Sequence, residues 1–447
     1  MKKLIRWLLP FFGFLFLIAY IRSATLDVVY TDYIRIVNSY LPDVFSFRPY
    51  LKADILTRTL ICYPERILNV LLFGYSTTFD MILGVIGLTL SSLVIGAYAY
   101  KKKLSAGIVA LLMFIIFSLD KWEMLTNGTG WVHFLTFVCF YYHYLVYDRV
   151  RSGEGKKNDE VLLCVLPVVT VIFISGSYCP IYVGALFAVY LIDYITKYGG
   201  ALKVKNLIAR MACIILPFIL YFISYMGSEE EIAGATSESF LSVVASDPLL
   251  PVKMILKSFG SMVIGGETAA EWAVPGALVC VFGLIIILGY IYAIYVNFKS
   301  GLYKETAFPM LLILSGLISH AIVFLTRWIF KSDDYMMSSR YALQFQSGIL
   351  GIILTFAMTD KKFVIRPVSI TLIVIILAGH LCTTGREIHM AQYRKVSFEN
   401  MSNVAVNFEN ETDDTLKSVL QYHDPAKTRN ALEILKENRW NVFRNRK

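Results

Sequence analysis

The sequence predicts an all-α polytopic membrane protein with about eleven transmembrane helices, and three observations lead to this fold class. Hydrophobic residues make up 57% of the 447 positions and charged residues only 17%, which is more apolar surface than a soluble chain could cover. The apolar residues gather in long runs, and roughly 20 such residues form a helix that crosses a bilayer. Lysine and arginine concentrate in alternate short connections, as in multi-pass membrane proteins.

Eleven apolar runs are predicted to be spans. The first is expected to be a retained helix, because "AYIRSATLD" places Arg22 where a signal-peptide cleavage site would need a small residue. By residue number, the predicted spans are 4–21, 73–98, 104–119, 130–147, 161–176, 180–196, 207–226, 275–297, 306–328, 341–358 and 366–384.

The basic residues of the short loops predict how these spans are oriented. They precede the first span and then follow alternate spans, as in "KKK" (101–103), "DRVRSGEGKK" (148–157) and "DKKFVIR" (360–366). Since basic loops stay in the cytoplasm, we expect a cell-membrane protein with a cytoplasmic N-terminus and an extracytoplasmic C-terminus. The net charge of +9 is explained by this bias, so no nucleic-acid partner is expected.

The expected organisation is a transmembrane domain, residues 1–384, followed by an extracytoplasmic tail, residues 385–447. The cytoplasmic loops are short and contain neither a P-loop nor a Gly-rich dinucleotide motif, so the chemistry is expected on the outer face. The outer segments with candidate functional residues are 22–66, 120–131, 227–274 and 327–341.

The first outer loop contains the stretch "YTDYIRIVNSY", which predicts an amphipathic helix lying on the membrane surface. Its apolar residues recur at helical spacing, and its polar residues share another face. The apolar set is Tyr30, Ile34, Val37 and Leu41, and the polar set is Asp32, Arg35 and Ser39.

Three more helical segments are expected outside the spans. Asp54 and Arg58 stand at i,i+4 after Pro49 and predict a second helix in the first outer loop. In the third outer segment, an acidic stretch precedes an interfacial or re-entrant helix between residues 251 and 265. In the tail, "DPAKTRNALEILKENRWNVF" begins with an Asp-Pro helix start and spaces Ala431, Leu432 and Leu435 as one helical face.

Asp32 is the main candidate for chemistry in the first outer loop. A carboxylate beside a helix and partly removed from water can act as a general base toward a sugar hydroxyl. Asp27, five residues earlier, could take the same role. The alternative for Asp32 is an ordinary surface ion pair with Arg35, which the spacing alone favours.

Other candidates would bind substrate. Arg340, followed by Tyr341 at the rim of the tenth span, suits a lipid phosphate, although a snorkelling anchor is the more common use of such a pair. Glu123 beside Trp122 could hold a sugar or belong to an interfacial turn. Arg66 in "YPERIL" could reach a phosphate or pair with its neighbour Glu65.

Taken together, the segments "YTDYIRIVNSYL", "RTLICYPERILNVLLFGYSTTFD", "SSRYALQFQSG" and "ALEILKENRWNVF" resemble the GT-C superfamily of polytopic glycosyltransferases. The resemblance is closest to bacterial, glucosyltransferase-like membrane proteins of unassigned specificity. It implies that Asp32 is the catalytic base and that Arg340 binds the phosphate of a polyprenyl-phosphate sugar donor. A divalent cation is left open as a cofactor, and no other cofactor is expected.

The expected function is therefore transfer of a sugar from a polyprenyl-phosphate donor to a glycan or lipid acceptor of the cell envelope, among membrane lipids. A nucleotide sugar would stay in the cytoplasm, where this chain has no catalytic domain. The alternatives are a polymerase or ligase of lipid-linked glycans, a transporter or flippase, and a non-catalytic protein of envelope assembly.

Overall fold

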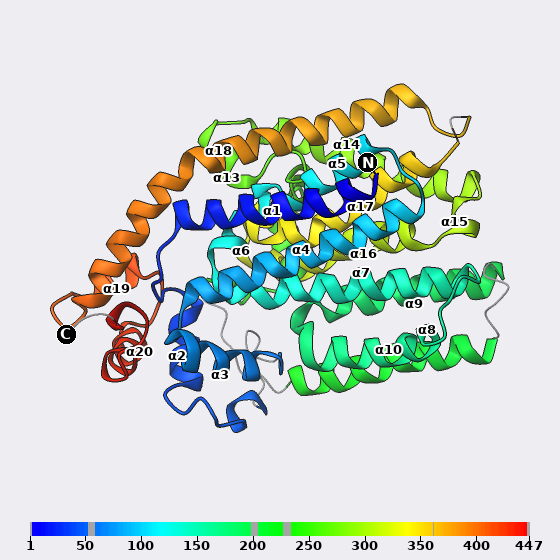
Figure 1. Cartoon of the computed structure of the whole chain (residues 1–447). Coiled ribbons are helices and arrows are strands. Elements are labelled where there is room, and N and C mark those ends of the chain that lie inside the picture. Colours follow the sequence, from blue (N-terminus) through cyan, green and yellow to red (C-terminus); the bar gives the residue numbers. More distant parts are fainter. Residues whose placement is uncertain (1, 52–58, 198–203, 227–233, 361, 445–447) are drawn as a thin grey trace.

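The computed structural model describes residues 2–51, 59–197, 204–226, 234–360 and 362–444, and within these ranges the chain is all-helical without a strand. Figure 1 shows the helices of the main bundle lying side by side, roughly along one direction. They are α1 (Lys2–Ala24), α4 (Thr77–Lys101), α5 (Ala106–Phe117), α7 (Trp131–Arg151), α8 (Asp159–Val169), α9 (Cys179–Thr196), α10 (Val204–Tyr225), α14 (Gly276–Lys299), α16 (Phe308–Arg327), α17 (Ala342–Met358) and α18 (Arg366–Val406).

Among the residues that the structure describes, eight helical segments are long and apolar enough to cross a membrane, and each coincides with a predicted span. They involve α1, α4, α9, α10, α14, α16, α17 and α18. The protein is therefore membrane-embedded and all-helical, as predicted, but the count of eleven spans is not confirmed.

The other three predicted spans are helical but fall short in length or hydropathy. Helix α5 has 12 residues, and α8 has 11 before a π-helical turn over Thr170–Ile174. Helix α7 has 21 residues, but it buries polar and aromatic side chains among its neighbours, including Tyr141, His143 and Tyr144. Side chains that face protein need not be apolar, so hydropathy is a weaker guide for a helix at the centre of a bundle.

The bundle has two different ends. At the short-loop end, brief connections join α4 to α5, α7 to α8, α14 to α16 and α17 to α18. At the long-loop end lie α2 (Asp32–Tyr40), α3 (Cys62–Phe73), α19 (Asp413–Val419) and α20 (Pro425–Glu437), which Figure 1 shows on the left. Helix α18 is 41 residues long and continues without a break past position 385, so the predicted domain boundary lies inside a helix.

The predicted tail helix is confirmed as α20. The Asp424 side chain caps it by accepting a hydrogen bond of 3.1 Å from the Lys427 N–H, and Pro425 occupies the first turn. Ala431, Leu432 and Leu435 are fully buried, as their spacing predicts.

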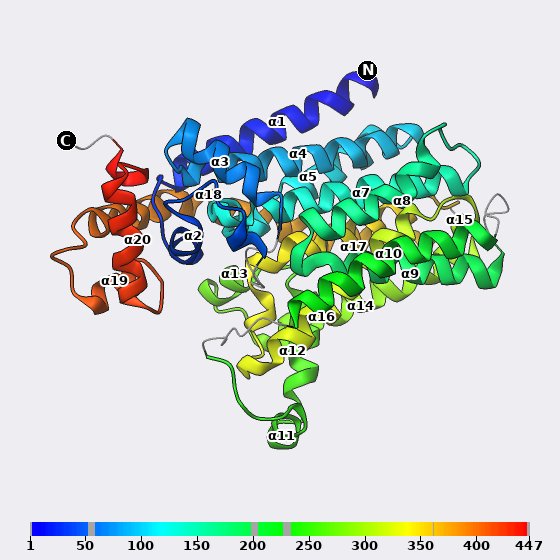
Figure 2. The same cartoon turned by 90° about the horizontal axis from the view of Figure 1, so that it is seen from below.

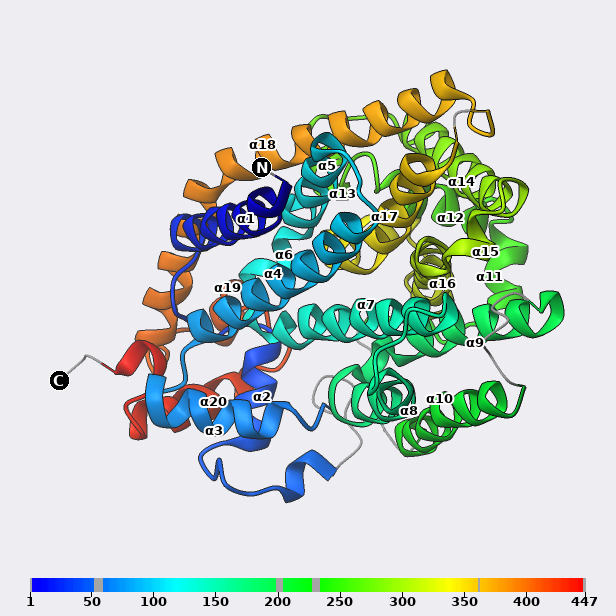
Figure 3. The same ribbon diagram turned by 45° about the vertical axis from the view of Figure 1, so that its right-hand side comes forward.

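The amphipathic helix of the first outer loop is confirmed as α2, but protein rather than lipid covers its apolar face. Ile34 and Val37 are fully buried in a hydrophobic cluster with Leu432 and Leu435 of α20. Helices α2 and α20 lie close together in Figures 1 and 3 and make direct contacts. The tail supplies a complementary apolar surface, which hydropathy alone cannot reveal.

The third outer segment contains α11 (Phe240–Ser246), α12 (Leu250–Gly260) and α13 (Gly266–Glu271). The helix predicted over 251–265 corresponds to α12, which packs against α14, while Figure 2 shows α11 beyond the bundle. Asp54 and Arg58, and the acidic residues 229–231, lie outside the described residues.

Asn441 connects the tail to the segment that precedes α2. Its backbone has φ of 52°, a left-handed conformation that asparagine tolerates. Its side-chain oxygen accepts from Val29 N–H at 3.1 Å, and its amide nitrogen donates to Asp27 Oδ1 at 2.9 Å and Tyr75 O at 3.0 Å. One buried side chain thus ties together the tail, the α2 segment and the turn before α4.

Replacing Asn441 with alanine should destabilise this junction by about 2–4 kcal/mol, because buried polar groups lose their partners. We expect a lower thermal midpoint and faster proteolysis within residues 407–424. Asn438→Ala is the matched control, since Asn438 is exposed just past the end of α20 and its side chain donates to the nearby carbonyl of Ile434. Equal behaviour of the two variants would contradict the proposed role of Asn441.

Candidate functional site

A cavity of about 470 Å³, here called the polar cavity, opens at the long-loop end of the bundle. Its walls come from segments far apart in the sequence, namely residues 30–36, 122–133, 177–178, 327, 340–341, 394–401 and 421. Four of the predicted site residues line it: Asp32, Glu123, Arg340 and Tyr341. The volume falls within the range of about 300–1,000 Å³ that is usual for small-molecule sites.

Asp32 reaches the polar cavity because it is the first residue of α2. The preceding Thr31 has φ of 44°, and its N–H donates to Leu420 O at 2.8 Å, which fixes the start of the helix against the tail. Burial raises the pKa of the Tyr30 hydroxyl, and the Glu123 and Asp32 carboxylates raise it further. Tyr30 therefore stays protonated in the neighbourhood of both carboxylates.

Glu123 and Arg340 form an ion pair in the cavity wall, with 2.5 Å between Oε1 and Nη2. Oε2 of Glu123 accepts hydrogen bonds from Ser338 Oγ at 3.0 Å and Ser339 Oγ at 3.3 Å. The Arg340 side chain remains 48% exposed, against 25% for Glu123. Arg340 can therefore still contact a ligand, but an anionic group would compete with Glu123 for the guanidinium.

Two further arginines line the polar cavity. Arg327 at the end of α16 donates from Nε to the Tyr341 hydroxyl at 2.8 Å. Arg394 of α18 lies over the Trp122 ring, 3.2 Å from its centroid. The cavity thus combines three guanidinium groups with two carboxylates, which favours an anionic ligand.

Arg394 was not predicted from the sequence, and its position depends on Glu387. This glutamate is fully buried, and its Oε2 accepts from Arg394 Nε at 3.1 Å and Nη2 at 2.7 Å. The two residues are seven apart on α18, so they share a face of one helix. That spacing could have indicated Arg394 if the last predicted span, residues 366–384, had been continued as a helix into the tail.

Aromatic side chains form much of the remaining wall. The rings of His133 and Tyr178 lie 4.5 Å apart, and Tyr30 meets Phe398 edge to face at 5.3 Å. Within the described part of the chain, Trp122 Nε1 and His133 Nδ1 have no hydrogen-bond partner.

Asp27 does not line the polar cavity. Its Oδ1 accepts from Thr77 N–H at 2.7 Å, from Thr77 Oγ1 at 2.8 Å and from Asn441. These bonds fix the beginning of α4 against the tail. Asp27 therefore stabilises the packing of the tail on α4, and the structure does not place it where a base would meet a ligand of the polar cavity.

Arg66 also lies away from the polar cavity. It is buried beside Glu65, with a closest N–O distance of 3.7 Å, and its guanidinium lies 5.2 Å from the centre of the Tyr40 ring. The space that Arg66 lines measures about 10 Å³, roughly enough for one water molecule and too small for a phosphate.

Among the described residues, no group of three or more His, Cys, Asp or Glu side chains is placed to hold a metal ion. No protein-family model, curated protein or solved structure matches the chain.

Proposed function

We propose that the protein is a GT-C-type membrane glycosyltransferase that takes its sugar from a polyprenyl-phosphate donor. One observation carries this proposal: Asp32 and three arginines, from segments far apart in the sequence, line a single cavity with aromatic walls. A carboxylate can accept the proton of a hydroxyl, guanidinium groups bind phosphate, and indole or phenol rings stack on sugars. All three components of such a site are thus present together.

The proposed reaction is a single displacement. Asp32 accepts the proton of the acceptor hydroxyl while the oxygen of that hydroxyl attacks C1 of the sugar. The bond between C1 and the phosphate oxygen breaks with inversion, and polyprenyl phosphate leaves with the electron pair. Arg340, with Arg327 and Arg394 nearby, stabilises the charge that grows on the departing phosphate.

Glu123 has a distinct role in this scheme. It holds Arg340 in the structure, so the donor phosphate must take over part of that guanidinium. After transfer, Glu123 can pair with Arg340 again and favour release of the lipid phosphate. Trp122, with Arg394 on its ring face, is proposed as a wall against which the sugar lies.

The proposed orientation places the polar cavity outside the cytoplasm, at the surface where lipid-linked sugars are used. The short-loop end carries Lys101 at the end of α4, Lys102 and Lys103 between α4 and α5, and Arg149 and Arg151 at the end of α7. The positive-inside rule supports a cytoplasmic position for that end. An outward-facing site has lipid-linked sugars rather than nucleotide sugars as donors.

The direct test uses the full-length protein purified into lipid nanodiscs. A panel of polyprenyl-phosphate and polyprenyl-diphosphate sugars would be incubated with and without acceptor glycans, and sugar release measured. We expect turnover of at least one monophosphate-linked donor, and a parallel series with EDTA would test for a divalent cation. Turnover of diphosphate-linked glycans alone would favour a polymerase or ligase, and donor binding without turnover would favour a transporter.

A further inference from the structure

A second cavity of about 470 Å³ lies beside the polar cavity, and Arg340 lines both. We propose that this second cavity holds the part of the lipid donor's hydrocarbon chain that is bonded to the phosphate. The inference rests on the proposed function, because it takes the ligand to be a lipid phosphate. It assigns the two ends of that ligand to two cavities that meet at one guanidinium.

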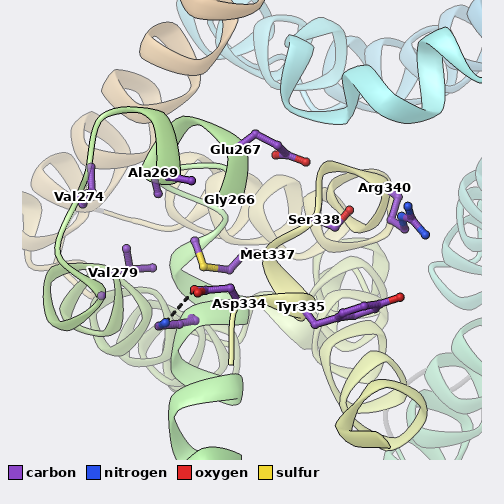
Figure 4. Close-up of a pocket in the computed structure, with 13 residues that line it drawn as sticks. Gly266, Glu267, Ala269, Val274, Val279, Asp334, Tyr335, Met337, Ser338 and Arg340 are labelled. Carbon is purple, nitrogen blue, oxygen red and sulfur yellow. Dashed lines mark hydrogen bonds and ion pairs between the residues drawn. The ribbon is translucent and has the colours of Figure 1, made fainter. Parts of the chain in front are cut away.

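Apolar residues of the second cavity lie on the side away from Arg340, and the Lys257–Asp334 ion pair lies among them. Figure 4 shows Val274, Val279 and Ala269 on one side, Met337 near the centre, and Arg340 on the opposite side. A lipid phosphate has the same arrangement, with a hydrocarbon at one end and an anionic group next to it. With its phosphate at Arg340, the sugar would extend into the polar cavity and the chain toward Val274.

The apolar side of the second cavity lies next to surface that suits the bilayer. Trp272, Leu278 and Val281 keep 49%, 43% and 51% of their surface exposed, and they flank the lining residues Val274 and Val279 in the chain. Exposed large apolar residues at the start of a membrane-spanning helix are expected to meet lipid. A chain could therefore pass sideways from the bilayer into the second cavity.

The charged groups of the second cavity have protein partners. Lys257 Nζ lies 2.8 Å from Asp333 Oδ2 and 2.7 Å from Asp334 Oδ1, the latter pair drawn in Figure 4. Glu267 Oε1 accepts from Ser339 N–H at 3.3 Å and Ser339 Oγ at 3.0 Å. These partners compensate the charges, so they oppose a hydrocarbon chain less than unpaired charges would.

The acceptor is the other ligand that the second cavity could take, and the placement of Asp32 argues against it. In a single displacement, the acceptor hydroxyl approaches C1 from the side opposite the leaving phosphate. Asp32 lines the polar cavity, whereas Arg340 lines both cavities. The second cavity therefore lies on the phosphate side of the reaction, where the lipid chain must leave.

Photo-crosslinking tests this assignment independently of turnover. The probe is polyprenyl phosphate without a sugar, carrying a diazirine on the isoprene unit next to the phosphate, bound to the full-length protein in nanodiscs. We expect adducts within residues 269–279 and at Met337, removed by excess unlabelled polyprenyl phosphate. Ala269→Trp, which fills the cavity, should lower their yield at least tenfold.

Val281→Trp is the matched control, because Val281 lies on the exposed face of α14 and not in the cavity. Should Ala269→Trp fold poorly, Val274→Trp places the same bulk on a half-buried lining residue. Adducts confined to the polar cavity, or spread over lipid-facing helices, would overturn the inference alone. A higher acceptor KM in Ala269→Trp with unchanged adducts would also overturn it, and failure to bind any lipid phosphate would overturn the proposed function as well.

Discussion

The Asp32→Asn variant should lose glycosyl transfer by a factor of about 10² to 10⁴, the usual contribution of a positioned general base. Asparagine has nearly the same shape as aspartate but cannot accept the proton of the acceptor hydroxyl. Asp32 is the first residue of a helix whose apolar face is buried, so the substitution should leave the fold intact. Donor binding should change little, because the arginines proposed to bind the phosphate remain.

Asp43→Asn is the matched control for this experiment, since Asp43 is exposed in the same loop and does not line the polar cavity. It should behave as the unmodified protein in turnover, donor binding and thermal unfolding. If Asp32→Asn retained full turnover, the base would have to be another group of the polar cavity. Glu123 would then be the first to test, because Asp27 is held at the start of α4.

The Arg340→Gln variant should weaken binding of polyprenyl phosphate about 10- to 100-fold, because a charge-assisted hydrogen bond contributes about 1.5–3 kcal/mol. Removing the Arg340 guanidinium also leaves the Glu123 carboxylate without its ion-pair partner, so an unpaired negative charge would lie near the phosphate. Glu123→Gln should have the opposite effect and tighten binding of the lipid phosphate, because the phosphate no longer competes for Arg340.

The double variant Glu123→Gln/Arg340→Gln separates these contributions. If the two residues act through each other, its affinity should exceed that of Arg340→Gln alone, and the single effects should not add. Arg429→Gln is the control, because it removes an arginine from the tail, where it pairs with Asp413 at 2.8 Å and donates to the carbonyls of Phe408 and Glu411 but does not line the polar cavity. Equal affinities for Arg340→Gln and the unmodified protein would refute a phosphate-binding role for Arg340.

Local patterns in the sequence were enough to predict most helices. Apolar runs located the eight long apolar helices, and the Asp-Pro start and leucine spacing located α20. Helical periodicity also found α2, and the structure then showed that Asp32 is its first residue. Such predictions succeed because helical hydrogen bonds and hydropathy depend on residues close together in the chain.

The same local reasoning could not separate the members of the site from residues that resemble them. Asp27 and Asp32 are equally acidic and five positions apart, yet one bonds the start of α4 and the other lines the polar cavity. Arg66 and Arg340 both stand near the ends of apolar runs, but a buried position beside Glu65 excludes Arg66 from the cavity. Which way each side chain faces depends on the packing of neighbouring helices.

The sequence by itself determined that this is an all-helical membrane protein, and it identified Asp32, Glu123, Arg340 and Tyr341 as candidates. Only the tertiary structure decided that these four share one cavity, that Arg394 joins them, and that the tail covers α2. The physical reason is that a helix forms from contacts within a few residues. A cavity instead forms where helices distant in the sequence pack together and leave space between their ends.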